Sequence, residues 1–278
     1  MCGGVQHFRR TGGLLPGAAF LVAALLSIIS APAFAGAWTR PAGDGLLITS
    51  FGHHRFDLGA EGFGYSKFET ALYAEYGLTD RFTLTGRLSQ ETRQRRFQVE
   101  QRQGGAPTLR SLSSVSQALG ESEIGLRANL LTSGDWVVSA QTSLVRFSAD
   151  PNPLLGGKAV WGADARLQIG RSVGEAVFME AQLGRRSGWD GARAETRLDL
   201  TLGVRPAEGW RVLAQGYSAW GQNGWGGYHS PFESHRLHLS VIAPLCERLS
   251  LQIGVINSVH SDRLAPEQAY MLSFWREF

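Results

Sequence analysis

Hydrophobic and polar residues alternate along most of the chain beyond its apolar N-terminal segment. In residues 65–77, for example, Leu72 and Ala74 alternate with Tyr73 and Glu75. Successive side chains of a β-strand point to opposite faces, so each alternating run predicts a strand with one apolar and one polar face. No segment in this part keeps the 3.6-residue period of an amphipathic helix over a helix length. The pattern therefore predicts an all-β protein.

About twelve alternating runs follow one another, separated by turn signals rich in Gly, Pro, Asn and Asp. They lie at residues 45–57, 65–77, 82–89, 124–130, 136–147, 163–169, 177–183, 198–204, 210–219, 237–243, 249–257 and 267–278. Connections after the even-numbered runs are short, and the others are longer or richer in Gly and Pro. Short turns at one end and longer loops at the other are typical of outer-membrane barrels. We expect a transmembrane up-and-down antiparallel β-barrel with both chain ends on the periplasmic side.

The polar faces of these strands carry full charges, which a membrane barrel would turn toward its lumen. The predicted lumen-lining residues, which are candidate solute contacts, are Glu75, Arg87, Glu123, Arg127, Asp164, Arg166, Glu180, Arg197, Asp199 and Arg236. A lining of both signs selects a solute by charge and hydrogen bonding, or it is an ion-pair network that fills a narrow barrel. Both interpretations remain open.

Tryptophans gather near the predicted strand ends, and Trp is enriched where a membrane meets water. The predicted aromatic girdle consists of Trp136, Trp161, Trp210, Trp220 and Trp275. A soluble barrel or sandwich shows the same alternation. However, the apolar faces mix small residues such as Ala128 with Leu and Val, which suits a lipid-facing surface that needs no interdigitated packing. The membrane barrel is therefore the favoured fold.

Residues 1–35 are expected to be a secretory signal peptide, and residues 36–278 the barrel domain. Arg9 and Arg10 precede a short apolar stretch, and a small-residue cleavage site follows at residues 33–35. The whole chain has 27 Lys and Arg against 24 Asp and Glu, so a nucleic-acid partner is not indicated. Beyond the signal peptide only Cys246 remains, which excludes an internal disulfide and a cysteine-based metal site. We expect no metal and no cofactor.

Residues 91–119 form the longest predicted connection and are rich in arginine. Folded inward, Arg93, Arg95, Arg96 and Arg102 would constrict the pore and favour anions. The same charges would bind lipopolysaccharide phosphates. A solvated loop, or a hairpin that extends the strands above the membrane, also fits the sequence.

Two other groups of residues invite a chemical interpretation. His238 and Ser240 share the predicted inner face, and a lipid-hydrolysing barrel needs a Ser-His-Asn arrangement. Outer-membrane phospholipases carry their His-x-Ser pair on the lipid-facing surface, so we expect no enzyme. Aromatics alternating with glycine in residues 220–228 suit a sugar-stacking loop, or interface anchoring at a flexible turn.

The last residues, 270–278, place Tyr270, Leu272, Phe274 and Phe278 on one strand face. This terminal strand resembles that of Gram-negative outer-membrane β-barrel proteins. The resemblance implies that Phe274 and Phe278 act as the assembly signal for the barrel-assembly machinery. The start at residues 36–45 is similar to that of proteobacterial barrels of the porin and transporter kind.

The implied location is the outer membrane, with its lipid and lipopolysaccharide as partners, and the implied state is a monomer. The leading functional hypothesis is a pore or transporter that passes a small polar solute. A closed structural or surface-recognition barrel is the alternative, and a lipid-modifying barrel is a third. The sequence names no solute and leaves open whether the lumen is plugged.

Overall fold

The computed structural model of the protein describes residues 36–57, 64–103, 106–148, 159–191, 194–221 and 231–278. The expected signal peptide lies outside these residues. No helix in the described ranges is long and apolar enough to cross a membrane. The strands are β1 (Gly45–Phe56), β2 (Gly64–Thr79), β3 (Phe82–Gln103), β4 (Ala106–Leu119), β5 (Ser122–Ser133), β6 (Trp136–Phe147), β7 (Val160–Val173), β8 (Val177–Gly188), β9 (Ala194–Val204), β10 (Arg211–Gly221), β11 (Phe232–Cys246), β12 (Leu249–Asp262) and β13 (Glu267–Glu277).

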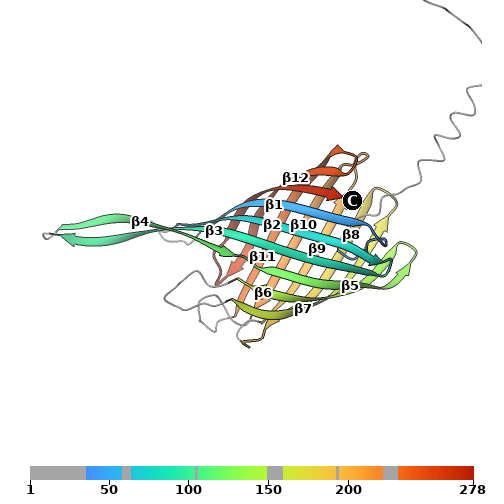
Figure 1. Cartoon of the computed structure of the whole chain (residues 1–278). Coiled ribbons are helices and arrows are strands. Elements are labelled where there is room, and N and C mark those ends of the chain that lie inside the picture. Colours follow the sequence, from blue (N-terminus) through green and yellow to red (C-terminus); the bar gives the residue numbers. More distant parts are fainter. Residues whose placement is uncertain (1–35, 58–63, 104–105, 149–158, 192–193, 222–230) are drawn as a thin grey trace, which may run out of the picture. The chain divides into compact units, whose positions relative to one another are not determined.

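The strands form one closed antiparallel barrel (Figure 1). Consecutive strands pair along the chain, and β1 closes the sheet against β13, with Leu46 opposite Glu277 and Phe56 opposite Glu267. Both β4 and β5 pair with β3, one after the other along its length, so together they fill a single position in the wall. The wall therefore has 12 strands. This confirms the predicted fold class.

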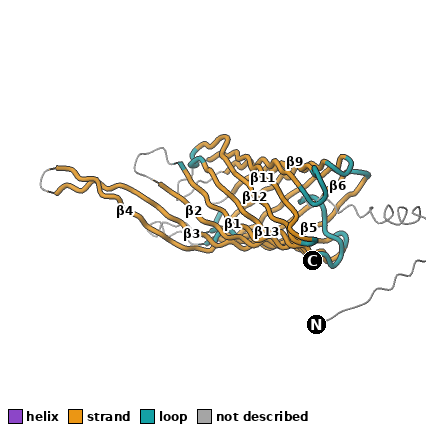
Figure 2. Tube along the Cα trace, turned by 90° about the horizontal axis from the view of Figure 1, so that it is seen from above, coloured by secondary structure: helices purple, strands orange, loops and turns teal. Residues whose placement is uncertain are grey.

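The hairpin of β3 and β4 extends beyond the barrel as an arm (Figures 1 and 2). The pairing of β3 with β2 ends where Arg96 meets Gly64, whereas its pairing with β4 continues to Gln103. At the base of the arm, the N–H of Gly120 donates to the carbonyl of Ser89 at 2.8 Å. Of the four interpretations of residues 91–119, the extended hairpin is confirmed.

Tight turns join the strands at the end of the barrel opposite the arm. Gly134, Gly174 and Gly209 lie in these turns with positive φ angles of 55°, 60° and 75°. Glycine adopts this left-handed conformation without the steric cost that a side chain brings. The turns at this end are short, as the sequence predicted, and short turns are typical of the periplasmic end of outer-membrane barrels, so this end is called the periplasmic end below.

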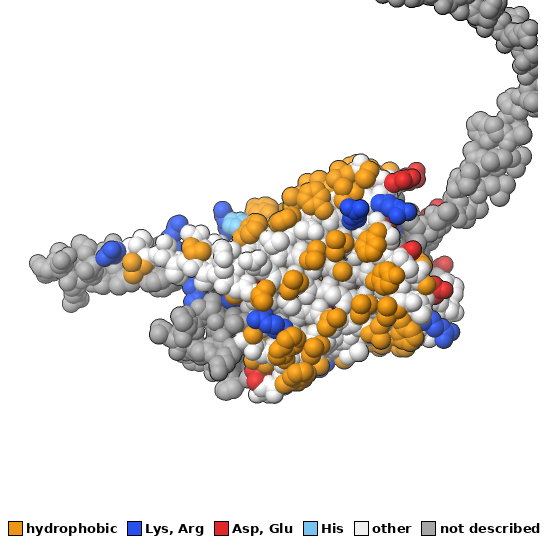
Figure 3. Space-filling view, viewed as in Figure 1, with side chains coloured by type: hydrophobic (Ala, Val, Ile, Leu, Met, Phe, Trp, Pro, Cys, Tyr) orange, Lys and Arg blue, Asp and Glu red, His pale blue; other side chains and the backbone are white. Residues whose placement is uncertain are grey.

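The outer face of the wall is apolar and the inner face polar. On the face seen in Figure 3, hydrophobic side chains are spread over the barrel wall. In β7, outward-facing Leu167 and Ile169 are exposed, whereas inward-facing Asp164 and Gln168 are buried. A lipid-facing exterior and a polar interior follow the alternation of the strands.

The predicted aromatic girdle is partly wrong. Trp136, Trp161, Trp210 and Trp220 are exposed on the outside of the wall. Trp275 faces inward instead, and its Nε1 donates to Oε1 of Gln252 at 2.9 Å. The alternation of β13 requires this placement, because Trp275 lies on the strand face opposite Phe274. The indole N–H needs a buried acceptor there, and Gln252 supplies it.

Candidate functional site

The barrel lumen is the candidate functional site. Ten charged residues that the alternation assigned to it lie on the inner faces of their strands: Glu75, Arg87, Glu123, Arg127, Asp164, Arg166, Glu180, Arg197, Asp199 and Arg236. Ion pairs link several of them to carboxylates on other strands. Nη2 of Arg87 lies 2.6 Å from Oε1 of Glu69, and Nη1 of Arg236 lies 2.9 Å from Oε2 of Glu267. Buried charges are tolerated when they are paired in this way.

The N-terminal segment (residues 36–44) enters the periplasmic end of the lumen. Arg40 is only 1% exposed, and its Nε donates to Oε2 of Glu75 at 2.8 Å. Its backbone N–H donates to Oγ1 of Thr83, also at 2.8 Å. Arg127 donates from Nη1 to the carbonyl of Trp38 at 3.1 Å and to Oε1 of Glu75 at 3.0 Å. Side chains of the wall therefore fix both the backbone and the arginine of this segment.

The indole of Trp38 packs into an apolar cluster on the inner wall. Phe178, Leu213 and Ile242 are buried there, and Trp38 and Trp275 pack against them. The rings of Trp38 and Phe178 meet edge to face, with centroids 6.4 Å apart. A Cβ on Gly170 would lie 2.4 Å from the indole of Trp38, so only glycine leaves room for the ring at that position. The periplasmic end is thus held by apolar as well as ionic contacts.

A second cluster, toward the arm end, surrounds Arg186 with carboxylates. Arg186 is 1% exposed, and its Nη1 lies 2.6 Å from Oε1 of Glu121. Its Nε lies 3.0 Å from Oδ2 of Asp164, and its Nη2 lies 3.4 Å from Oε2 of Glu123. Arg166 shares Asp164, with its Nε 2.8 Å from Oδ1. This cluster ties β5, β7 and β8 together and leaves little free charge.

The seam where the barrel closes carries a third network, which spans β1, β2, β3, β11 and β13. His54 Nδ1 lies 2.5 Å from Oε1 of Glu267, which also pairs with Arg236. Lys67 lies between two carboxylates, with Nζ 2.8 Å from Oε2 of Glu69 and 3.4 Å from Oε1 of Glu91. Side chains of both signs therefore stand at the same level of the lumen.

Solvent access differs sharply among the inward-facing charges. The side chains of Arg87 and Arg236 are 39% and 38% exposed, although both point into the barrel. Arg40 and Arg186 are each 1% exposed. Solvent therefore has access to the inner face around Arg87 and Arg236, whereas Ala37, Arg40 and Arg186 are closed off from it.

The prediction that residues 91–119 fold inward as a loop is wrong, because this segment forms the arm. Arg93 lies in the barrel mouth, buried, with its guanidinium on Glu91 and its Nη2 2.5 Å from Oγ of Ser148. The guanidinium of Arg95 lies over the ring of Tyr65, 5.9 Å from its centroid. Arg96 is exposed at the base of the arm, and Arg102 belongs to the part of β3 that leaves the barrel. Continued pairing with β4 carries this segment away from the pore.

His238 and Ser240 lie inside the barrel and both are buried. Oγ of Ser240 accepts a hydrogen bond from Nε2 of Gln252 at 2.9 Å, and the ring of His238 stacks near Tyr217 at 6.4 Å. A Cβ on Gly254 would lie 2.4 Å from Nε2 of His238, so the imidazole fills the space beside this glycine. The pair does not face lipid.

Several lumen residues were not among the predicted site residues. Glu69 lies within the run at residues 65–77, on the same face as Glu75, and Arg186 lies three residues beyond the run at 177–183, so the alternation alone would have found both. Trp38 and Arg40 belong to no strand, so no periodicity marks them. The sugar-stacking loop at residues 220–228 lies almost wholly outside the described residues.

The fold is that of known outer-membrane barrels. The COG4313 outer membrane channel from Pseudomonas putida F1 superposes with a TM-score of 0.64 at 15% sequence identity, covering 89% of this chain and 100% of that one. The translocator domain of the autotransporter NalP from Neisseria meningitidis gives 0.51 at 10% identity, covering 94% and 96%. The NanC porin gives 0.53 at 10% identity, covering 82% and 98%. The chain therefore shares the closed antiparallel β-barrel fold of these outer-membrane proteins.

No protein-family model matches the chain, and no curated protein sequence matches it. The similarity is therefore one of fold.

Proposed function

We propose that the barrel is an outer-membrane channel that passes a small polar solute through its charged lumen. The observation that carries this proposal is the solvent access of Arg87 and Arg236, which face inward yet remain 39% and 38% exposed. Paired charges closed off from solvent would serve structure alone, whereas Arg87 and Arg236, although paired with Glu69 and Glu267, keep accessible surface that a solute can reach. Since both residues are arginines, the channel is proposed to favour anions weakly.

The N-terminal segment is proposed to form the constriction of this channel. It stands in the lumen at the periplasmic end, fixed by Glu75, Arg127 and Thr83. Apart from the backbone hydrogen bonds of Gly43 and Asp44 with Gly77, this segment contacts the wall through side chains, so it is more easily displaced than a wall strand with its full ladder of backbone hydrogen bonds. Solute passage is therefore proposed to depend on how this segment sits.

Single-channel recording in planar bilayers tests the proposal. Full-length, heat-modifiable protein is expected to conduct with low conductance and with a reversal potential that indicates weak anion preference. A Trp38→Ala/Arg40→Ala variant is expected to conduct several-fold more. If both proteins insert correctly and both stay silent, the channel proposal is wrong.

A surface-recognition role is the second candidate, and the arm favours it. The β3–β4 pairing continues to Gln103 and Ala106, well past the last contact with β2. Replacing residues 97–111 by a two-residue turn is expected to leave conductance unchanged. Recognition would be favoured over transport by two results together: the wild-type protein does not conduct, and the shortened variant no longer binds a partner at the cell surface.

We further propose that the chain is exported with cleavage after Ala35, is inserted by the barrel-assembly machinery, and acts as a monomer without enzymatic activity. Phe278 supports the assembly role, because its backbone pairs with Gly45 at the seam, with N–O distances of 2.8 and 3.1 Å. N-terminal sequencing of the outer-membrane form should begin at Gly36, and native mass spectrometry should give the mass of one chain. A retained N-terminus or a dimeric mass would contradict these points.

A further inference from the structure

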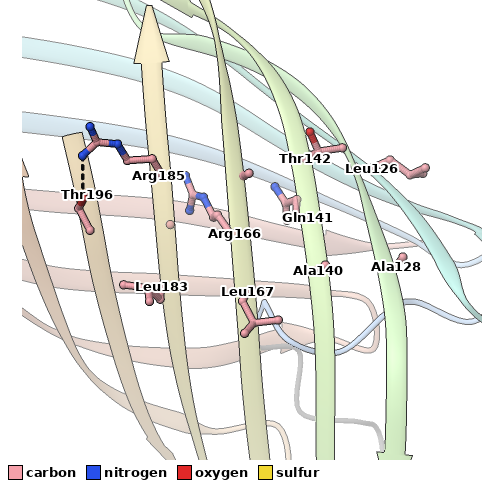
Figure 4. A pocket seen from close by; sticks show the side chains of 12 residues that line it. Leu126, Ala128, Ala140, Gln141, Thr142, Arg166, Leu167, Leu183, Arg185 and Thr196 are labelled. Carbon is pink, nitrogen blue, oxygen red and sulfur yellow. Dashed lines mark hydrogen bonds between the residues drawn. The ribbon is translucent and has the colours of Figure 1, made fainter. Parts of the chain in front are cut away.

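A shallow groove with a volume of about 660 Å³ crosses the outer wall over strands β5 to β9. Its floor consists of small outward-facing side chains, Ala128, Ala140 and Ala165. The pairing register aligns them: Ala140 stands opposite Ala128 on one side and opposite Leu167 on the other. Leu167 also faces Leu183 on β8, so larger apolar side chains border the floor. Figure 4 shows Ala128, Ala140, Leu167 and Leu183 on successive strands of the wall.

One cation stands at the edge of this groove. Arg185 is exposed on the same outward face of β8 as Leu183, and it pairs in register with Ala165. Its Nη1 donates to Oγ1 of Thr196 on β9 at 2.9 Å, the dashed line in Figure 4. Within the part of the chain that the structure describes, no carboxylate forms an ion pair with Arg185. The guanidinium of Arg185 therefore faces the membrane, and most of its N–H donors have no hydrogen-bond acceptor among the described residues.

The height of Arg185 in the wall limits what can meet it. Strand β8 starts after the short turn at Gly174 and ends at Gly188, at the end where the arm leaves the barrel. Arg185 thus lies in the external half of the membrane. A charged side chain on the lipid face is unfavourable unless it reaches water or an anion. In the outer leaflet, the anions at that depth are the phosphates of lipid A.

We propose that this groove binds one lipopolysaccharide molecule, with a lipid A phosphate on Arg185 and one acyl chain along Ala165, Ala140 and Ala128. Arginine forms bidentate hydrogen bonds with phosphate, and Thr196 orients the guanidinium for this contact. Lipid tails elsewhere are as apolar as the groove, so burial alone gives no preference. Selectivity comes from the phosphate contact together with the close fit of a chain over the alanine floor. The site is independent of the proposed channel.

Native mass spectrometry of the full-length protein tests the phosphate contact, with purified bis-phosphorylated lipid A as the probe. Arg185→Gln is expected to lower lipid A occupancy about tenfold, the size of one lost charge-assisted contact. Arg171→Gln is the matched control: this arginine also faces outward, but it lies at the periplasmic end, 5.0 Å from the ring centroid of Trp136. Occupancy that falls equally in both variants, or in neither, would overturn the proposal.

Two further measurements test the occupant. Ala140→Leu fills the floor of the groove and should lower lipid A occupancy, whereas Ala214→Leu, an outward-facing alanine on β10 outside the groove, should not. Lipid A without phosphates should bind far more weakly than the phosphorylated form. Equal binding of the two would show that the guanidinium does not hold a phosphate. Equal competition by phosphatidylglycerol would show that the groove takes any anionic lipid, and the assignment to lipopolysaccharide would be wrong.

Discussion

The two ends of the lumen are built from the same wall but differ in how they are filled. At the periplasmic end, the N-terminal segment brings Trp38 and Arg40 into the barrel, where Arg40 is 1% exposed. At the level of Arg87 and Arg236, no added segment is seen among the described residues, and both side chains are accessible to solvent. Narrowing in this barrel therefore comes from chain inserted into the lumen, and the wall alone leaves solvent space. Four variants would break or sharpen this contrast.

The largest effect is expected for Glu75→Ala, which affects the stability of the filled end. Glu75 pairs with both Arg40 and Arg127, and removing it leaves two buried guanidinium groups short of a partner. Breaking a buried ion pair from one side costs about 3–5 kcal/mol. Urea unfolding of the refolded protein in detergent micelles measures the loss. Glu175→Ala, in the exposed β7–β8 turn, should change stability by less than about 0.5 kcal/mol. An equally small change for Glu75→Ala would show that the segment is not held by this pair.

The second effect is expected for the conductance of Trp38→Ala/Arg40→Ala. The variant loses the indole from the apolar cluster and the Arg40–Glu75 pair, so the segment no longer stays in the lumen. Conductance should rise several-fold in planar bilayers. Thr39→Ala serves as the control, because the hydroxyl of Thr39 donates to the exposed carbonyl of Asp80 at 2.8 Å and takes no part in the contacts of Trp38 and Arg40 described above. Unchanged conductance in the double variant would show that this segment does not form the constriction.

Gly170→Val should give a smaller rise in conductance by the same route. The new Cβ would lie 2.4 Å from the indole of Trp38, so the ring must move while Arg40 keeps its ion pair. Gly216→Val is the matched control, since nothing lies within 4 Å of a Cβ there. If both variants conduct like the wild type, a shift of the Trp38 indole does not widen the lumen.

The smallest effect is expected for Arg87→Gln, which affects the open part of the lumen. Removing one hydrated cation should shift the reversal potential in a KCl gradient toward neutrality, with conductance changed by less than about twofold. Arg171→Gln, on the outer face, should not move the reversal potential. A shift of the same size in both variants would mean that the charge of the whole protein, and not its lumen lining, sets the preference.

The wall was predictable and the filling was not, for a physical reason. The alternation of Leu72, Tyr73, Ala74 and Glu75 reflects a strand with the membrane on one side and water or polar groups on the other. Every wall strand has these two environments, so the sequence shows the alternation at every wall strand. The N-terminal segment has no such two-sided environment. Its position depends on partners such as Glu75 and Thr83, which are distant in sequence.

The placement of Trp275 and the interpretation of the arm share one origin: residue type was given more weight than position along the strand. Trp275 was assigned to the interface because it is a tryptophan, although its place opposite Phe274 required the inside. For the arm, a loop and an extended hairpin both stayed open, since its residues lack an apolar face. Outside the membrane, a strand pair needs no apolar face, because water satisfies both sides.

Strand β3 runs unbroken from Phe82, beside the periplasmic turn, to Gln103 in the arm. It carries Glu91 and Arg93 in the barrel mouth, and its neighbours on both sides are hydrogen-bonded to it there. In mechanical terms, the arm is the free end of a strand whose longer part, from Phe82 to Arg96, is hydrogen-bonded into the wall. A load applied to the arm outside the cell would pass along one continuous backbone to the charged side chains that surround the pore.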